Sequence, residues 1–270
     1  MAKLGAGKLI TSWPVLVIAG WGVAALLADV LPLQPDHIDL GHILAAPGAN
    51  GLLGADDLGR DILARLVDGA RVALLVAVSV TAATMTAGTV LGLIAGYFGG
   101  WVDRFLMHIT DVFMAFPGIL LAIAFAAVLG PGIGNLILAL CLTSWVGYAR
   151  LTRAQALSLR RRQHVLAAES LGASVPRIML RHMLPLLAAP LVVEATYSIA
   201  SLIIAEASLS FLGLGIQAPA SSWGAMLRDG VRYLLVAPHY VLAVGLSLMS
   251  LVLAVNVLGD KLRDILDVKR

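Results

Sequence analysis

The stretch RRRQHVLAAESLGASVPRIMLRHMLP, residues 160–185, is a basic, helix-prone segment that lies between two strongly apolar runs. Residues 163–173 contain no proline and are rich in alanine, leucine and glutamate, which favours a helix, and Pro176 limits its extension. Four small or apolar residues fall on one face of this helix: Ala167, Ala168, Leu171 and Gly172. A narrow face flanked by arginines fits a groove on a soluble partner protein. Packing of the helix on its own bundle is the alternative.

The remainder of the chain is too apolar for a water-soluble domain. Of its 270 residues, 60% are hydrophobic and 13% are charged, and the mean hydropathy is +0.93. The chain is therefore a polytopic membrane protein. Its net charge of +3 does not indicate nucleic-acid binding, because the basic residues lie beside apolar runs, as in cytoplasmic loops. The single cysteine, Cys141, lies inside an apolar run and is predicted to be a packing residue.

The predicted fold class is an all-α helical bundle with six transmembrane helices. Windows of about 20 apolar residues, the length that crosses the hydrocarbon core, occur at residues 10–31, 72–98, 105–129, 133–154, 184–208 and 239–260. The loop between the fourth and fifth spans carries Arg150, Arg153, Arg160, Arg161, Arg162, Arg177 and Arg181. The C-terminal tail carries Lys261, Arg263, Lys269 and Arg270. The positive-inside rule therefore predicts that this loop and both termini are cytoplasmic.

Four regions follow from this topology. Residues 1–31 form the cytoplasmic N-terminal end and the first span, 32–71 an outer loop, 72–262 a five-helix core that includes the loop 155–185, and 263–270 a cytoplasmic tail. In the outer loop, four apolar residues recur at helical spacing: Leu58, Ile62, Leu66 and Val67. With Asp61 and Arg65 as an i,i+4 pair on the other face, they predict a short helix along the membrane surface. Residues 213–238 are expected to form a re-entrant or capping structure at the outer mouth.

Ionisable side chains inside apolar runs are costly and mark candidate functional residues. Glu194 and Glu206 lie in the fifth predicted span, on roughly the same face, where they would face a polar translocation path or its gate. Hydrogen bonding to neighbouring helices, or a position of Glu206 at the membrane surface, is the alternative. Asn256, in the last span, is a further candidate for the path.

Other patterns indicate packing rather than chemistry. Three charged residues cluster at a predicted cytoplasmic turn, where ion pairing at helix ends is favoured: Asp103, Arg104 and Asp111. Three glycines of the second span form a double small-xxx-small pattern, which favours close packing inside the bundle, with a subunit interface as the alternative: Gly88, Gly92 and Gly96. Neither a P-loop nor an H-E-x-x-H pattern occurs, so we expect no catalytic residues, cofactor or metal.

Several blocks carry a resemblance to a known family. Residues 166–172, LAAESLG, followed by residues 181–185, RHMLP, resemble the EAA loop of bacterial ABC importer permeases. Three further blocks are similar to the C-type permease subunit of dipeptide, oligopeptide and nickel importers: residues 53–62, LGADDLGRDI; GGWVDR at 99–104 through Asp111 to Pro117; and residues 206–215, EASLSFLGLG, with Trp223 and Gly224.

The resemblance implies the type I ABC importer permease fold and a place in the bacterial inner membrane. It implies half of a translocation path shared with a homologous second permease, two ATP-binding subunits on the cytoplasmic side, an extracytoplasmic substrate-binding protein, and a periplasmic location for the outer loop. Contact with membrane lipid is expected and contact with nucleic acid is not. Peptide is the predicted substrate, with nickel or a metal chelate as the alternative. A stand-alone channel or secondary transporter is remote, because no inverted repeat is seen.

The resemblance also assigns the coupling to the ATPase. It implies that Ala167, Ala168, Glu169, Gly172 and Pro185 belong to the segment that docks on an ATPase subunit. Leu166 stands where the family motif usually has its leading glutamate, and Leu186 where an asparagine is common. Glu169 is expected to replace the lost charge in part.

Overall fold

The computed structural model describes residues 12–49 and 51–267, and these are helical apart from loops and an isolated bridge between Ala55 and Asp61. The elements in chain order are α2 (Trp13–Leu27), the 3-10 turn η1 (Leu40–His42), α3 (Ile62–Phe98), α4 (Gly100–Met114), α5 (Gly118–Leu129), α6 (Ile133–Leu159), α7 (Gln163–Ser170), α8 (Val175–Arg177), the π-helical turn η2 (Ile178–Met183), α9 (Leu184–Phe211), α10 (Trp223–Val231) and α11 (Pro238–Asp267). The predicted all-α class is confirmed.

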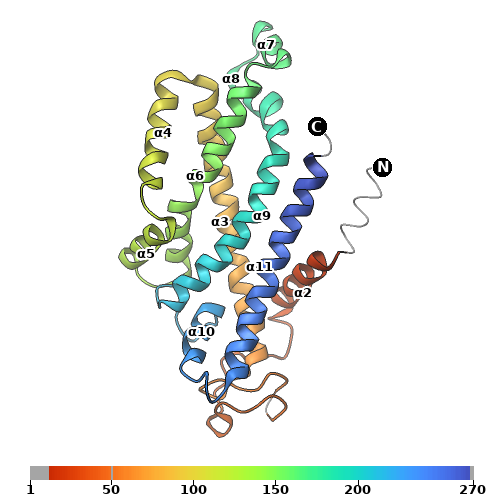
Figure 1. The fold of residues 1–270 in the computed structure, drawn as a ribbon, viewed down its shortest axis with the longest axis vertical. Helices are drawn as coiled ribbons and strands as arrows, with labels where there is room; N and C mark the ends of the chain where they lie inside the picture. Colours follow the sequence, from red (N-terminus) through yellow and green to blue (C-terminus); the bar gives the residue numbers. More distant parts are fainter. Residues whose placement is uncertain (1–11, 50, 268–270) are drawn as a thin grey trace.

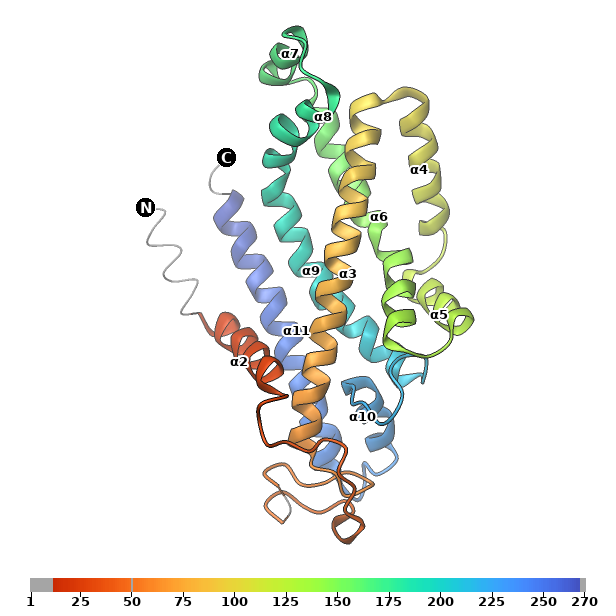
Figure 2. The same cartoon turned by 180° about the vertical axis from the view of Figure 1, so that it is seen from behind.

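Four long helices, α3, α6, α9 and α11, run side by side and form the body of the molecule (Figure 1). The small helix α7 stands beyond one end of this bundle, and α10 lies near the opposite end with the loop that precedes α3. Helices α4 and α5 flank one side, and α2 packs on α3 and α11 on the other (Figure 2). We call the two ends the α7 end and the α10 end.

The predicted spans all appear as helices, with one correction. Helices α3, α6, α11 and the run Val175–Phe211 are long and apolar enough to cross a membrane. The third predicted span, residues 105–129, is wrong as one helix, because α4 and α5 are bent by 84° at the break between them. Pro117 lies at this break; it has no N–H and disfavours helical geometry in the residue before it. Helix α2 has 15 residues, shorter than a full crossing, and residues 10 and 11 of the first predicted span lie outside the described part.

The predicted surface helix in the outer loop does not form as a separate element. Ile62 instead begins the 37-residue helix α3, and the Asp61 side chain caps it by accepting from the Leu63 N–H at 3.0 Å. Arg65 lies 3.4 Å from Asp56 rather than forming the expected pair with Asp61. Three residues of the apolar stripe, Ile62, Leu66 and Val67, therefore lie in the buried first part of the spanning helix, and Leu58 lies in the turn before it.

The glycine stripe of α3 packs inside the bundle, as predicted. A Cβ placed on Gly88 would lie 2.6 Å from the Trp145 carbonyl oxygen, and one on Gly96 would lie 2.5 Å from the Ala156 Cβ. The Cβ of a larger residue at Gly92 would meet the Ala149 backbone. The backbones of α3 and α6 therefore approach closely along three turns of helix.

Residues 213–238 contain α10, which is fastened to the start of α3. Trp223 is fully buried and its Nε1 donates to the Leu66 carbonyl oxygen at 3.0 Å. The Ser221 N–H donates to the Asp68 carboxylate at 3.1 Å. The predicted re-entrant or capping segment is thus a short helix held over the α10 end by α3.

The core is divided into two clusters along the bundle. The larger one joins α3, α5, α6, α9, α10 and α11 and includes Leu136, Ile203 and Trp223. The smaller one lies toward the α7 end and joins α3, α6, α7, η2 and α9 around Tyr148 and Met183. Helix α9 passes from one cluster to the other.

Substitution of Gly88 by alanine is expected to destabilise the bundle by about 1–3 kcal/mol, because the added methyl group overlaps the α6 backbone. Thermal unfolding of the purified protein in detergent measures the change. Gly245→Ala is the matched control, since a Cβ there meets nothing within 4 Å. Equal melting temperatures for the two variants would contradict the close α3–α6 contact.

Candidate functional site

Helix α7 projects from the α7 end between α6 and the short helix α8 (Figure 1). Arg162, in extended conformation, precedes its first residue, and the Val165 and Leu166 N–H groups donate to the Arg162 carbonyl oxygen at 3.0 and 3.1 Å. The three residues between α6 and α7 are hydrogen-bonded to the end of α6, because the N–H groups of Arg160, Arg161 and Arg162 donate to the carbonyl oxygens of Ala156, Ser158 and Leu159. Helix α7 is therefore joined to α6 by a short hydrogen-bonded turn.

The predicted docking face of α7 is divided by the fold. Ala168 is 9% exposed and packs with Val165 in the smaller core cluster, against residues that include Ile178 and Met183. Ala167 is exposed on the other side of the helix. The expectation that Ala167 and Ala168 share one docking face is wrong, because the return segment through α8 and η2 covers the side on which Ala168 lies.

Gly172 ends α7 rather than enlarging its face. Its φ of +77° lies in the left-handed region, the Gly172 N–H donates to the Glu169 carbonyl oxygen, and the Ala173 N–H donates to the Ala168 carbonyl oxygen, both at 3.0 Å. This pair of bonds is a Schellman motif, which glycine favours. Gly172 is exposed, so it also lies on the outer surface of the turn.

Pro185 lies in the first turn of α9, directly after the π-helical turn η2. Proline has no N–H to donate, so a helix tolerates it only where that donor is unused. The Leu184 N–H donates to the Met179 carbonyl oxygen, five residues earlier. Pro185 is exposed and thus serves the join between the return segment and α9.

The outer surface of α7 combines apolar and basic side chains. Leu171 is 87% exposed and Leu166 is 48% exposed. The neighbouring exposed side chains include Ala167 and Glu169 and five arginines: Arg160, Arg161, Arg162, Arg177 and Arg181. Exposed leucines surrounded by charge are typical of a protein interaction site.

A cavity of about 460 Å³ lies between α5, α6 and α9. Its polar lining consists of hydroxyl groups and one carboxylate: Thr143, Ser144, Glu194, Tyr197, Ser198, Ser201 and Ser208. Five of these seven residues, those from Glu194 to Ser208, lie on one face of α9 within an arc of about 100°. Glu194 is half-buried and is the one charged residue among the described residues that line the cavity.

The other two predicted path residues lie elsewhere. Glu206 is fully buried in the body of the bundle, where one carboxylate oxygen accepts from Ser210 Oγ at 2.8 Å. The expected common face with Glu194 is wrong, because twelve residues leave about 120° between them. Asn256 is half-buried on α11 and does not line this cavity.

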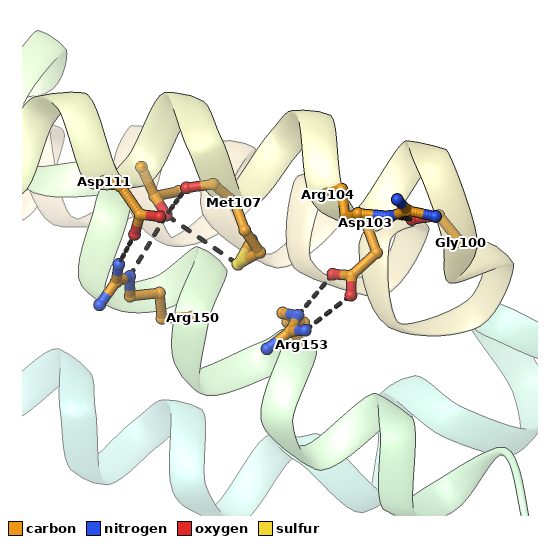
Figure 3. A network of polar contacts seen from close by, with 8 residues as sticks. Gly100, Asp103, Arg104, Met107, Asp111, Arg150 and Arg153 are labelled. Carbon is orange, nitrogen blue, oxygen red and sulfur yellow. Dashed lines mark hydrogen bonds and ion pairs between the residues drawn. The ribbon is translucent and has the colours of Figure 1, made fainter.

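The charged residues predicted to cluster at a cytoplasmic turn lie along helix α4 instead, and two of them form ion pairs with residues of α6. Asp103 and Asp111 lie on α4, and they pair with Arg153 and Arg150 on α6 (Figure 3). Arg104 is exposed, and its Nε lies 3.4 Å from the Gly100 carbonyl oxygen. Placing Arg150 and Arg153 in a loop was therefore wrong.

The α10 end holds a second charged cluster in the loop before α3. The Asp56 carboxylate is fully buried and accepts from Arg60 Nε at 2.7 Å, with Arg65 Nε at 3.4 Å. Burial raises the pKa of the neighbouring Asp57 carboxyl above its usual value, and the carboxylates of Asp56 and Asp229 raise it further. These contacts fasten the loop to the bundle.

Two kinds of functional residue were missed in the sequence. The polar residues of the cavity on α9 share one face of that helix within an apolar run, and this pattern was the available signal. The partners of Asp103 and Asp111 lie 50 and 39 residues away, on a different helix, and no local pattern marks them.

A bundle of apolar helices with a polar cavity between them and an exposed helix at one end defines a helical membrane transport subunit. The model of the family described as binding-protein-dependent transport system inner membrane component matches residues 88–269. The chain belongs to this family, and it has the type I ABC importer permease fold.

Similar proteins support this assignment. The dipeptide transport system permease protein DppC of Alkalihalophilus pseudofirmus is 44% identical over 256 residues, covering 94% of this chain and 84% of that protein. The glutathione transport system permease protein GsiD of Pectobacterium atrosepticum is 41% identical over 262 residues, covering 94% and 87%. A solved structure of the MetNI methionine ABC transporter, in inward facing conformations, matches with a TM-score of 0.59 and 19% identity over 76% of this chain and 97% of that chain. At that identity, the match concerns the fold alone.

Ala168→Arg is expected to destabilise the chain by about 3 kcal/mol or more, because it forces a charge into the smaller core cluster. Ala167→Arg, one position along and exposed, is expected to change stability by less than about 0.5 kcal/mol. Thermal unfolding in detergent compares the two. If Ala168→Arg melts at the wild-type temperature, the division of the α7 surface described above is incorrect.

Proposed function

We propose that this chain is a permease subunit of an ATP-driven importer for di- or oligopeptides. It forms half of the translocation path with a homologous second permease. The complex has two ATP-binding subunits on the cytoplasmic side, one of which docks at the α7 end of this chain, and a substrate-binding protein delivers cargo at the α10 end. The chain itself is non-catalytic, and both termini are cytoplasmic.

The choice of peptide over nickel rests on similarity and on the cavity. The relatives named above carry the names of dipeptide and glutathione systems. Within the described residues, no three histidine, cysteine, aspartate or glutamate side chains are placed to hold a metal ion. The cavity instead offers hydroxyl groups and one carboxylate, which suit the amide and ammonium groups of a peptide.

The path is proposed to follow the polar face of α9. Glu194 and the serines that follow it line the cavity between α5, α6 and α9. A second permease facing this side would enclose the cavity. The position of Glu194 in the cavity supports the predicted role of this side chain in the translocation path, whereas the burial of Glu206 favours a structural role for that side chain.

The ATPase contact is proposed to use the outer surface of α7. Leu166 and Leu171 supply apolar area there, and the arginines around them supply positive charge. Leu166 occupies the position of the usual family glutamate. The apolar contact therefore replaces the missing charge, with Glu169 as an exposed acid on the same helix.

The exposed surface of α7 is the observation that carries the proposal, and assembly tests it. Co-expression of the chain with its candidate permease, ATPase and binding-protein partners is expected to yield a complex that imports peptide only with ATP. The purified chain alone in liposomes is expected to transport nothing. Uptake by the chain alone would overturn the proposal.

Leu171→Asp is expected to weaken ATPase association by about 10- to 100-fold. The substitution removes an apolar contact and places a carboxylate in the interface, where it must lose its water. Leu235→Asp is the matched control: Leu235 is 97% exposed and follows α10, near the opposite end. Dissociation constants from biolayer interferometry with the permease pair in nanodiscs measure both. Equal constants for the two variants would remove α7 as the docking surface.

Glu194→Gln is expected to lower peptide uptake by about tenfold, because the cavity loses a charged acceptor for the peptide ammonium group. Glu206→Gln on the same helix keeps an acceptor for Ser210 and lies outside the cavity, so its uptake is expected to match wild type. Uptake of radiolabelled peptide into proteoliposomes measures both variants. If only Glu206→Gln lowers uptake, the path runs elsewhere.

A further inference from the structure

Two ion pairs join helix α4 to α6. Arg153 Nε and its terminal nitrogen donate to the two carboxylate oxygens of Asp103 at 2.5 and 2.6 Å, which is a two-pronged arginine–carboxylate pair (Figure 3). Asp111 pairs with Arg150, whose Nε also donates to Thr110 Oγ1 at 3.2 Å. The two acids are eight residues apart, about 12 Å along α4. The pairs therefore hold α4 at two separated points.

Few α4 side chains are buried in this attachment, although Phe113 of α4 makes an edge-to-face contact with Trp145 of α6, with ring centroids 5.6 Å apart. Within α4, which the structure describes in full, Thr110 is the one buried residue. The side chains of Asp103 and Arg153 are only 15% and 32% exposed. A half-buried, two-pronged pair resists sliding and rotation better than a few apolar contacts, because its geometry is directional.

This attachment lies between the two surfaces of the proposed function. Arg153 is less than two turns from Leu159, the last residue of α6, after which the chain enters α7. In the other direction, α4 leads through the bend at Pro117 into α5. Gly118 and Ala122 of α5 line the cavity opposite Glu194.

We propose that the Asp103–Arg153 pair, supported by Asp111–Arg150, is a strut that makes α4 and α5 move with α6. When ATPase subunits displace α7, α6 carries the α5 wall of the cavity with it. Asp103 and Arg153 are positioning residues that determine how much cargo moves for each ATP hydrolysed. This inference rests on the proposed function.

Charge neutralisation and charge exchange test the strut in the complete transporter. The assay uses proteoliposomes that contain the partner permease, the ATPases and the binding protein. In this system, Asp103→Asn is expected to retain ATP hydrolysis but to lower peptide uptake per ATP about tenfold. A tenfold loss corresponds to the interaction energies that are measured between contacting residues. The double variant with Asp103→Arg and Arg153→Asp is expected to recover uptake per ATP. Asp29→Asn, which breaks the Arg71 pair near the start of α3, is the matched control with unchanged uptake per ATP.

The outcomes separate this inference from the proposed function. A wild-type complex that fails to import peptide overturns the proposed function. Wild-type import with unchanged uptake per ATP in Asp103→Asn overturns the strut alone. An assembled double variant that stays uncoupled also overturns it.

A distance measurement decides the matter if the charge variants fail to assemble. With Cys141 replaced by alanine, spin labels at Arg104 and Leu157 report the α4–α6 distance, and labels at Leu120 and Val192 report the α5–α9 distance. On ATP binding, the first distance is expected to stay constant while the second changes. A larger change between α4 and α6 than between α5 and α9 would refute the strut.

Discussion

The close approach of α3 and α6 is the contact on which the other helices depend. At Gly88, Gly92 and Gly96 the backbone of α6 occupies the space that a side chain would need. In a lipid environment, burial of apolar surface between helices gains little, because lipid tails are equally apolar, so close packing of backbones is a main source of association. This pair places Arg153 beside α4 and Tyr148 in the smaller core cluster. Both the strut and the seat of α7 are built on it.

Charge is distributed through this bundle according to the partners available. Asp56 pairs with Arg60 and Arg65 at the start of α3, with Asp57 3.7 Å from Arg60 as a second acid, and Asp103 pairs with Arg153 where α4 meets α6. Such pairing offsets the cost of removing a charge from water. Glu194 differs from these groups because it faces a cavity lined with hydroxyls. In the proposed function, this carboxylate is the group that meets the peptide.

The sequence predicted the spans well because each needs about 20 apolar residues, a signal contained within one segment. It also predicted the glycine packing, since a four-residue period is local. Most of the failures depend on contacts between residues that are not neighbours in the sequence. Arg65 pairs with Asp56 rather than Asp61, Ala168 is covered by the return segment, and Arg153 finds its partner 50 residues earlier in the chain. The break at Pro117 was visible, yet a hydropathy window averages over it.

The two core clusters give a physical reason for the position of the cavity. Leu187 and Leu191 of α9 belong to the smaller cluster, whereas Ala200 and Ile203 belong to the larger one. The cavity begins at Glu194, between the two clusters, and continues along the larger one, because Ala122, Leu140 and Leu202 of that cluster also line it. Force applied at the exposed leucines of α7 reaches the smaller cluster first, because Val165 and Ala168 are part of it. Under the proposed function, movement of that cluster relative to the larger one changes the shape of the cavity, whose lining combines polar groups with members of the larger cluster.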